Sequence, residues 1–304
     1  MTASPISPDR ASTTAVANDQ HRHHRRGLVK NVVFPALAVL FFAIMSFPVY
    51  WMINSSFLPN GKIRNDVPTF FPAEDFTWRN YTTAIFDEPQ APFLPALQQS
   101  LKVTFLTLIV VLIVAFLASV AVGRYVFRGR KAFIVAILVI QMIPGEAMML
   151  TYSRIMDSWG MLNSVFGLGM IYIASVLPFT IWTLRGFVTA VPVELEEAAM
   201  VDGLSRSGAF WRITFPLLAP GLISTGIFAF IQAWNEFTMA LVIMLRPETM
   251  TLPVWLRTFQ QATRATDWGA LMAGSTLIAI PVLIFFLIVQ GRMTGGLVSG
   301  AVKG

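Results

Sequence analysis

The sequence predicts an all-α membrane protein with six transmembrane helices and a cytoplasmic helix-turn-helix elbow between the fourth and fifth spans. Three observations predict this class. Mean hydropathy is +0.65 and only 12% of the residues are charged, which is typical of a polytopic membrane protein and not of two soluble domains. Several apolar runs have the length of about 20 residues that a helix needs to cross a bilayer. One polar stretch, Val191 to Gly221, interrupts these runs and must lie in water.

Residues 1–30 are predicted to form a disordered, basic cytoplasmic tail. They are rich in Ser, Thr, Pro, Ala and Asp, lack apolar periodicity and end in HRHHRRGLVK. A metal site in the His and Arg cluster is the alternative, although the positive-inside rule already explains a basic flank before a first span. That span is placed at 32–54, and because no small-residue cleavage pattern follows it, a signal peptide is not expected.

The remaining spans are predicted at 101–123, 132–152, 163–184, 217–245 and 270–290. They belong to one transmembrane domain, 31–292, which is followed by a cytoplasmic tail, 293–304. Assigning Lys and Arg to the loops puts fourteen on the side of the elbow and both termini, seven on the other side, and Lys102 at the interface. This asymmetry predicts that the termini and the elbow are cytoplasmic.

Features between and within the spans predict how they pack. The Pro-rich segment 55–100 should form a small cap on the bundle, because it has too little core of its own. In the second span, Ala115, Ser119 and Gly123 make a ridge of small residues that permits close helix packing. Pro144, Pro178 and Pro281 mark bends in otherwise apolar helices.

The polar stretch is predicted to form the elbow, with the coupling loop at 186–216. Residues 194–200 are strong helix formers, and Pro192 suits a first helical turn. Gly203 permits a tight reversal, after which a second short helix should run from Ser207 to Thr214 and stop at Pro216.

The elbow resembles the EAA loop of permease subunits of bacterial ABC importers in residue type and spacing, and only Phe215 departs, where the family usually has Leu. The alternative is an ordinary acidic amphipathic connector. The resemblance implies contact with a partner ATPase, in which Glu197 pairs with a basic side chain. The implied coupling residues are Glu197, Ala198, Ala199, Asp202, Gly203, Ile213 and Pro216.

Two further segments resemble the carbohydrate-importing branch of these permeases. The segment PAEDFTWRNYTTAIF resembles one common before the second span, and GLVSGAVKG resembles the Gly-rich terminus of that branch. Contact of the C-terminal tail with the ATPase is implied by resemblance only, and a frayed tail is the alternative. The tail residues concerned are Ser299, Gly300, Ala301, Val302, Lys303 and Gly304.

Polar residues inside predicted spans mark a candidate substrate path. Gln232, Asn235 and Glu236 have i, i+3, i+4 spacing and should share one helix face, while Trp234 could stack on a sugar ring. Because a carboxylate facing lipid is costly, this face should turn to protein or to a water-filled cavity. A ligand path and a structural network remain equally open, and Gln141 in the third span poses the same question, as does Glu146.

The resemblance implies that this chain is half of the translocation pathway of an ATP-driven importer for a di- or oligosaccharide or a related polyol. Its implied partners are a second permease, two ATP-binding subunits and an extracytoplasmic solute-binding protein, at the bacterial cytoplasmic membrane. No nucleic-acid partner is expected. The chain lacks a phosphate-binding Gly-rich loop, so the partner subunits would bind ATP and Mg²⁺.

No enzymatic activity, metal site or cofactor is expected on the chain itself. Cys is absent and the three histidines lie in the N-terminal tail. The alternatives are a secondary transporter and a non-transporting membrane scaffold; the sequence shows neither the coupling-ion ligands nor the internal repeat typical of the former.

Overall fold

A computed structural model describes residues 32–73, 75–87, 91–260 and 265–301, with side chains as far as Gly291. Within these ranges the chain is helical and contains no strand. It divides into two compact units, residues 1–54 and 55–304. The described part of the first unit is mostly α2 (Phe34–Ser56), an apolar helix with exposed side chains whose last two residues belong to the second unit.

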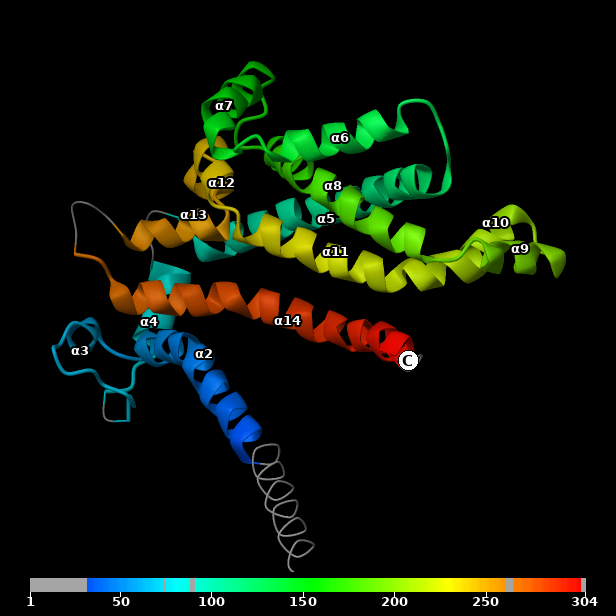
Figure 1. The fold of residues 1–304 in the computed structure, drawn as a ribbon. Coiled ribbons are helices and arrows are strands. Elements are labelled where there is room, and N and C mark those ends of the chain that lie inside the picture. Colours follow the sequence, from blue (N-terminus) through cyan, green and yellow to red (C-terminus); the bar gives the residue numbers. More distant parts are fainter. Residues whose placement is uncertain (1–31, 74, 88–90, 261–264, 302–304) are drawn as a thin grey trace, which may run out of the picture. The chain divides into compact units, whose positions relative to one another are not determined.

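Among the described residues, five helices are long and apolar enough to cross a membrane, and a bent pair could supply a sixth span. The second unit contains α5 (Phe93–Arg124), α6 (Arg130–Gln141), α7 (Met149–Ser158), α8 (Val165–Ala190), α11 (Phe215–Asn235) and α14 (Trp268–Ala301). Figure 1 shows α5, α8 and α11 side by side, in agreement with their mutual contacts. An all-helical fold is therefore confirmed.

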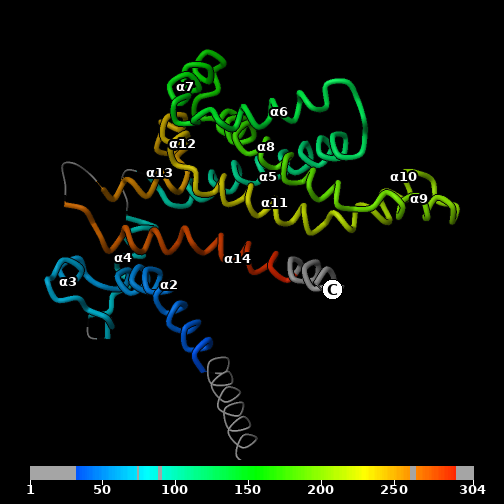
Figure 2. Tube along the Cα trace, in the orientation of Figure 1, coloured from blue at the N-terminus to red at the C-terminus, as the bar shows by residue number. Residues whose placement is uncertain are grey.

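The third predicted span, 132–152, is broken in the structure at the position where Pro144 predicts a bend. Helix α6 ends at Gln141, η3 (Glu146–Met148) follows, and the axis turns by 78° before α7, a change of direction visible in Figure 2. Pro144 lies in this break, where it cannot donate a backbone hydrogen bond. Pro178 and Pro281, by contrast, lie inside the continuous helices α8 and α14.

The fifth predicted span, 217–245, also differs from the structure. Helix α11 ends at Asn235, and a separate short helix, α12 (Thr238–Ile243), follows after Glu236 and Phe237. Glu236 has an extended backbone with ψ at 124°, which ends the helical ladder. Two of the predicted spans are thus interrupted inside their apolar sequence.

The segment before α5 packs on the second unit as expected. Its short helices are α3 (Asn60–Ile63), α4 (Arg79–Thr82) and η2 (Thr83–Asp87), which contact the first turns of α14. The Asn60 amide donates to Asp267 Oδ1 at 2.7 Å and accepts from the Gly269 N–H at 3.0 Å. The buried Asn80 amide donates to two carbonyls at 2.8 Å, so a half-buried and a buried amide fix the loop ends. Helix α5 begins at Phe93, earlier than the predicted 101.

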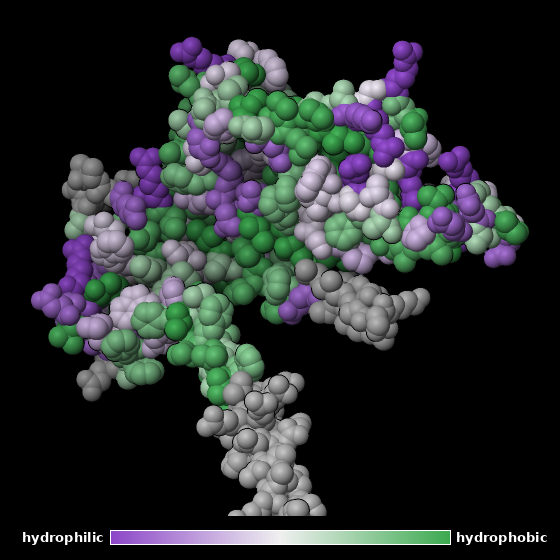
Figure 3. Space-filling model, in the orientation of Figure 1, coloured by the Kyte–Doolittle hydropathy of each residue, from purple (hydrophilic) through white to green (hydrophobic). Residues whose placement is uncertain are grey.

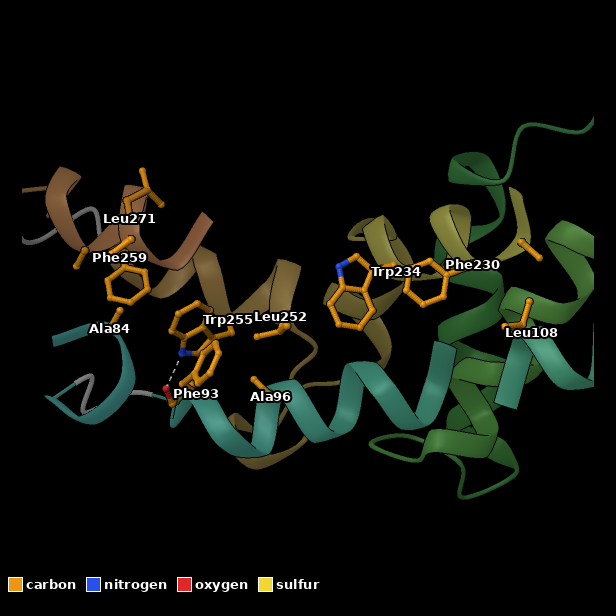
Figure 4. Close-up of a cluster of buried hydrophobic side chains, with 14 of the residues drawn as sticks. Ala84, Phe93, Ala96, Leu108, Phe230, Trp234, Leu252, Trp255, Phe259 and Leu271 are labelled. Atoms are coloured by element: carbon orange, nitrogen blue, oxygen red, sulfur yellow. Dashed lines mark hydrogen bonds between the residues drawn. The ribbon is translucent and has the colours of Figure 1, made fainter. Parts of the chain in front are cut away.

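Aromatic side chains from distant segments form the core of the second unit (Figure 4). Trp255 of α13 (Leu252–Leu256) is fully buried, packs edge-on against Phe93 and donates from Nε1 to the Ala91 carbonyl at 2.9 Å. Phe230 stacks on Trp234 and on Phe285 of α14. Helix α13, with η5 (Pro247–Thr249) and η6 (Arg257–Phe259), thereby anchors the connection between α12 and α14.

The ridge of small residues in α5 is confirmed as a packing surface. Ala115 and Ser119 are completely buried, and a Cβ at Gly123 would lie 2.5 Å from Val188 Cγ1 of α8. The glycine therefore sets the distance between α5 and α8 at the ends of these helices that adjoin the elbow.

Candidate functional site

The first half of the elbow folds as the sequence predicts. Helix α9 (Glu194–Val201) carries three carboxylates in its first turn, where the helix dipole favours negative charge. Gly203 has a positive φ of 92°, and the Leu204 N–H donates to the Ala199 carbonyl at 3.0 Å. This is a Schellman-type ending that glycine adopts without a Cβ penalty, so the predicted reversal is confirmed.

The second half of the elbow differs from the prediction. Helix α10 (Arg206–Ala209) is capped by Ser205, whose Oγ accepts from the Gly208 N–H at 3.1 Å. It continues through a π-helical turn, η4 (Phe210–Thr214), directly into α11, so Pro216 does not end it. The wider turn before Pro216 makes room for a ring that would clash in an α-helix. The elbow and the fifth span therefore share one continuous helix.

A carboxylate ties the elbow to the bundle. Thr214 Oγ1 donates to Glu196 Oε1 at 2.6 Å, and Arg124 Nη2 lies 3.2 Å from the same oxygen. The two charged side chains are only 11% and 14% exposed. Arg124 Nη1 also donates to the Val191 carbonyl at 2.9 Å. The Nη2 contact is an ion pair without hydrogen-bond alignment, and Nε has no acceptor among the described residues.

Sequence reasoning missed this tie between Arg124, Glu196 and Thr214. It treated Arg124 as a topological charge and Glu196 as a helix former, because the partners lie far apart in the chain and no local spacing connects them. A basic residue at the end of an apolar run was the only signal.

The expected coupling residues fall on different sides of the elbow. Glu197, Ala198, Asp202 and Pro216 are exposed, whereas Ala199 is buried and Ile213 is half-buried. Apolar side chains on the same exterior include Met200, Val201 and Trp211, which are 38%, 87% and 55% exposed. The elbow thus presents acidic and apolar groups together, and Figure 3 shows hydrophilic and hydrophobic atoms mixed over α9 and α10. This is a surface suited to a protein partner.

A second candidate site is a cavity of about 340 Å³ where the two helix breaks meet, which we call the broken-helix cavity. Its walls come from the α6–η3–α7 segment, from α8 and from the α11–α12 junction. Figure 3 shows hydrophilic atoms around a hollow between α6 and α12. Its polar side chains are Gln141, Glu146, Tyr152, Tyr172, Ser175, Glu236 and Thr238.

The structure brings together only part of the predicted substrate path. Gln141 and Glu236 line the same cavity, although 95 positions separate their numbers in the sequence. Gln232 and Asn235 are exposed on α11 and do not line it. Trp234 is 1% exposed, stacks on Phe230 and donates to the Ile278 carbonyl, so its ring is not available to a sugar in this conformation.

The prediction that Glu236 shares a helix face with Gln232 and Asn235 is wrong, because the helix ends before Glu236. Its carboxylate instead caps α12, accepting from the Met239 N–H at 2.7 Å and the Ala240 N–H at 3.0 Å. Tyr172 of α8 donates its hydroxyl to the same carboxylate at 2.7 Å. Glu236 therefore fixes the break against α8 and forms one wall of the cavity.

The C-terminal tail can be followed only in part. Ser299, Gly300 and Ala301 lie in the last turns of α14, and Val302, Lys303 and Gly304 are outside the described residues, as is the N-terminal tail. Trp234 contacts Ile278 and Phe230 stacks on Phe285, so α11 and α14 run antiparallel. The end of α14 therefore points toward the same end of the second unit as the elbow.

Within the described ranges no group of three or more His, Asp or Glu residues could hold a metal ion. The surface of the elbow combines exposed carboxylates with exposed apolar side chains, and the cavity is lined by groups that can form hydrogen bonds.

Comparison with known proteins gives three kinds of likeness. Residues 115–294 match the family described as binding-protein-dependent transport system inner membrane component. The chain is 45% identical to the diacetylchitobiose uptake system permease protein DasC of Streptomyces coelicolor, over 92% of this chain and all of that protein. It is 32% identical to the trehalose/maltose transport system permease protein MalG of Thermococcus litoralis, over 92% and 99%.

Solved structures agree on the fold. A chain of a bacterial ABC transporter that imports the acidic polysaccharide alginate superposes with a TM-score of 0.72 at 20% identity, covering 88% of this chain and 97% of that one. A chain of a bacterial alginate ABC transporter, solved with a pentasaccharide-bound periplasmic protein, gives 0.60 at 16% identity, covering 88% and 94%.

Proposed function

This chain belongs to the family of binding-protein-dependent transport system inner membrane components, and from that premise we propose how it works and what it carries. It is a membrane-embedded permease subunit of an ABC importer, a transport component and not an enzyme. Our proposal is that it forms half of the pathway for a di- or oligosaccharide. The observation that supports a coupling mechanism is the contact of Glu196 in the elbow with Arg124 and Thr214 in the bundle.

The substrate class is proposed from the relatives. Permeases named for diacetylchitobiose and for trehalose or maltose match over more than nine-tenths of this chain. A permease named for trehalose, SugB of Mycobacterium tuberculosis, is 33% identical over 84% of the chain. Short, hydroxyl-rich saccharides are what these names share, and polar groups at the broken-helix cavity supply the donors and acceptors that such ligands need.

The elbow would couple this pathway to a partner ATPase. Glu197 and Ala198 are exposed at its surface, where the carboxylate can pair with a basic side chain of the partner. A push on α9 would pass through Glu196 to Arg124 at the end of α5 and to Thr214 at the start of α11. The contact with Arg124 would move α5, and the continuity of η4 with α11 would move α11 at the same time. Alternating access requires coupled motion of this kind.

The proposed assembly contains a second permease, two ATP-binding subunits that hold ATP and Mg²⁺, and an extracytoplasmic solute-binding protein. The exposed polar face of α11 with Gln232 and Asn235 would face the pathway between the two permeases. In the cytoplasmic membrane, the elbow and both termini would be cytoplasmic. The antiparallel pairing of α11 and α14 supports this for the C-terminus, whose tail would reach the ATPase.

The test is ATPase activity of the purified complex in lipid nanodiscs, with binding protein that is empty or loaded with diacetylchitobiose, trehalose or maltose. We expect one loaded sugar to stimulate hydrolysis and to be taken up by proteoliposomes. If no ATPase co-purifies and none of the sugars is taken up, a scaffold becomes the better reading. Uptake driven by an ion gradient without ATP would favour a secondary transporter.

A further inference from the structure

Two interrupted helices converge on the broken-helix cavity. The break at 142–145 lies inside the predicted third span, and the break at Glu236 and Phe237 lies inside the predicted fifth span. Non-helical backbone at membrane depth is tolerated only where protein buries it or where it lines a water-filled cavity. Here residues of both breaks border the same open space, so the cavity is a surrounding in which both interruptions are tolerated.

The polar groups around the cavity divide into fixed and available ones. Glu236 already accepts three hydrogen bonds, one of which is donated by the Tyr172 hydroxyl. Gln141, Glu146 and Ser175 are exposed to the cavity. The Ser175 hydroxyl donates to the Tyr172 carbonyl at 2.9 Å, which leaves its oxygen able to accept. A wall held rigid by one carboxylate thus faces amide, hydroxyl and carboxylate groups that can bind a ligand.

The charge of the cavity sets what it accepts. Its lining includes two carboxylates, Glu146 and Glu236, and no Lys, Arg or His among the described residues that line it. An anionic ligand would meet like charge without a cation to offset it. Its volume of about 340 Å³ lies near the lower end of the range of about 300–1,000 Å³ for small-molecule sites. These features suit the end of a short neutral saccharide.

We propose that the broken-helix cavity is a saccharide subsite on this chain, in which Gln141, Glu146 and Ser175 contact the sugar and Glu146 disfavours acidic sugars. The proposal rests on the proposed transport of saccharides, and adds that this subunit selects them by contact. Selection would therefore not reside wholly in the binding protein or in the second permease.

The chain contains no cysteine, so a single introduced thiol reports on one position. Ser175→Cys is labelled with a membrane-impermeant thiol reagent in the detergent-solubilised complex, without binding protein, and labelling of this chain alone is followed on a gel. Free N,N′-diacetylchitobiose should slow labelling by about tenfold at about ten times its dissociation constant, since the fraction of unoccupied sites falls as 1/(1 + [L]/Kd). A dimer of uronic acids at the same concentration should slow it much less.

The matched control is Ser224→Cys on α11. Its Oγ also bonds a carbonyl of its own helix, at 2.9 Å from the Pro220 oxygen, but it lies outside the cavity. Labelling at this position should not respond to either sugar. Equal slowing at both positions would indicate a global rearrangement and would overturn the subsite.

A second variant tests the charge argument. Adding Glu146→Lys to Ser175→Cys should make the uronic acid dimer protect about as well as the neutral sugar. If the two sugars protect equally before this change, Glu146 does not select against acidic sugars and that part of the proposal is wrong.

The two proposals fail in different ways. If loaded binding protein stimulates ATPase and uptake while no sugar protects Ser175→Cys, transport stands and the subsite is wrong. If no sugar stimulates ATPase or is taken up, the proposed function itself fails, whatever the labelling shows.

Discussion

In the elbow, the Glu196 carboxylate is enclosed by Arg124 and Thr214, whereas at the broken-helix cavity Gln141 and Glu146 face open space. The elbow directs its ionic contacts inward and keeps a continuous helix into α11. The cavity is built where two helices stop, and Glu236 fixes one of its walls by hydrogen bonds to α8 and α12. The enclosed polar contacts of the elbow suit a region that transmits motion. The interrupted helices and exposed polar groups of the broken-helix cavity suit a region that binds a ligand.

The largest expected effect is that of Arg124→Ala. Removing the guanidinium leaves the Glu196 carboxylate mostly buried without its cation, which typically costs about 3–5 kcal/mol in stability. We expect a lower thermal unfolding temperature of the complex and uptake that falls further than ATPase activity. The matched control is Arg128→Ala, because Arg128 is exposed and its loss should change neither quantity. Unchanged stability and coupling in Arg124→Ala would remove the mechanical distinction between the two regions.

Gly123→Ala tests the packing behind the elbow. The new Cβ would lie 2.5 Å from Val188 Cγ1, and overpacking of this kind costs about 1–3 kcal/mol. We expect the complex to unfold at a lower temperature, and we expect Val188→Ala in the same chain to recover part of the loss. A double variant no more stable than Gly123→Ala alone would argue against the close approach of α5 and α8.

Gly203→Ala tests the reversal in the elbow. Nothing lies within 4 Å of the added Cβ, so the cost is backbone strain at φ of 92°, about 1–2 kcal/mol. We expect reduced uptake per ATP hydrolysed, measured in proteoliposomes, because a bent α9 ending would move Glu197. Gly186→Ala has equal space without a positive φ and should behave as the parent protein. If Gly203→Ala takes up as much sugar per ATP hydrolysed as the parent protein, the elbow tolerates a changed backbone conformation at this turn.

The two regions also differ in how far sequence could predict them. The turn at Gly203 and the helix before it follow from local propensity, and the ridge around Gly123 follows from spacing along one helix. The tie to Arg124 and the meeting of Gln141 with Glu236 depend on tertiary packing between distant segments, which local pattern does not encode. The helix breaks were hidden for a related reason: an apolar run reveals a membrane segment, and not where its helix stops.

The smallest expected effect on stability, and the most informative for the cavity, is that of Gln141→Ala. Its side chain is exposed and makes no structural contact comparable to that of Glu236, so the unfolding temperature should stay the same. Loss of one hydrogen bond to a neutral sugar costs about 0.5–1.5 kcal/mol, which corresponds to a rise of about 2–13-fold in the sugar concentration that half-saturates uptake. Measured with saturating binding protein, a change in maximal rate alone would mean that Gln141 affects the motion of the helices, and a change in the half-saturating concentration would mean that it contacts the ligand.

Because Glu236→Gln weakens the wall of the cavity itself, this variant should lower both stability and uptake. The contrast between Gln141→Ala and Glu236→Gln separates the binding surface of the cavity from its support.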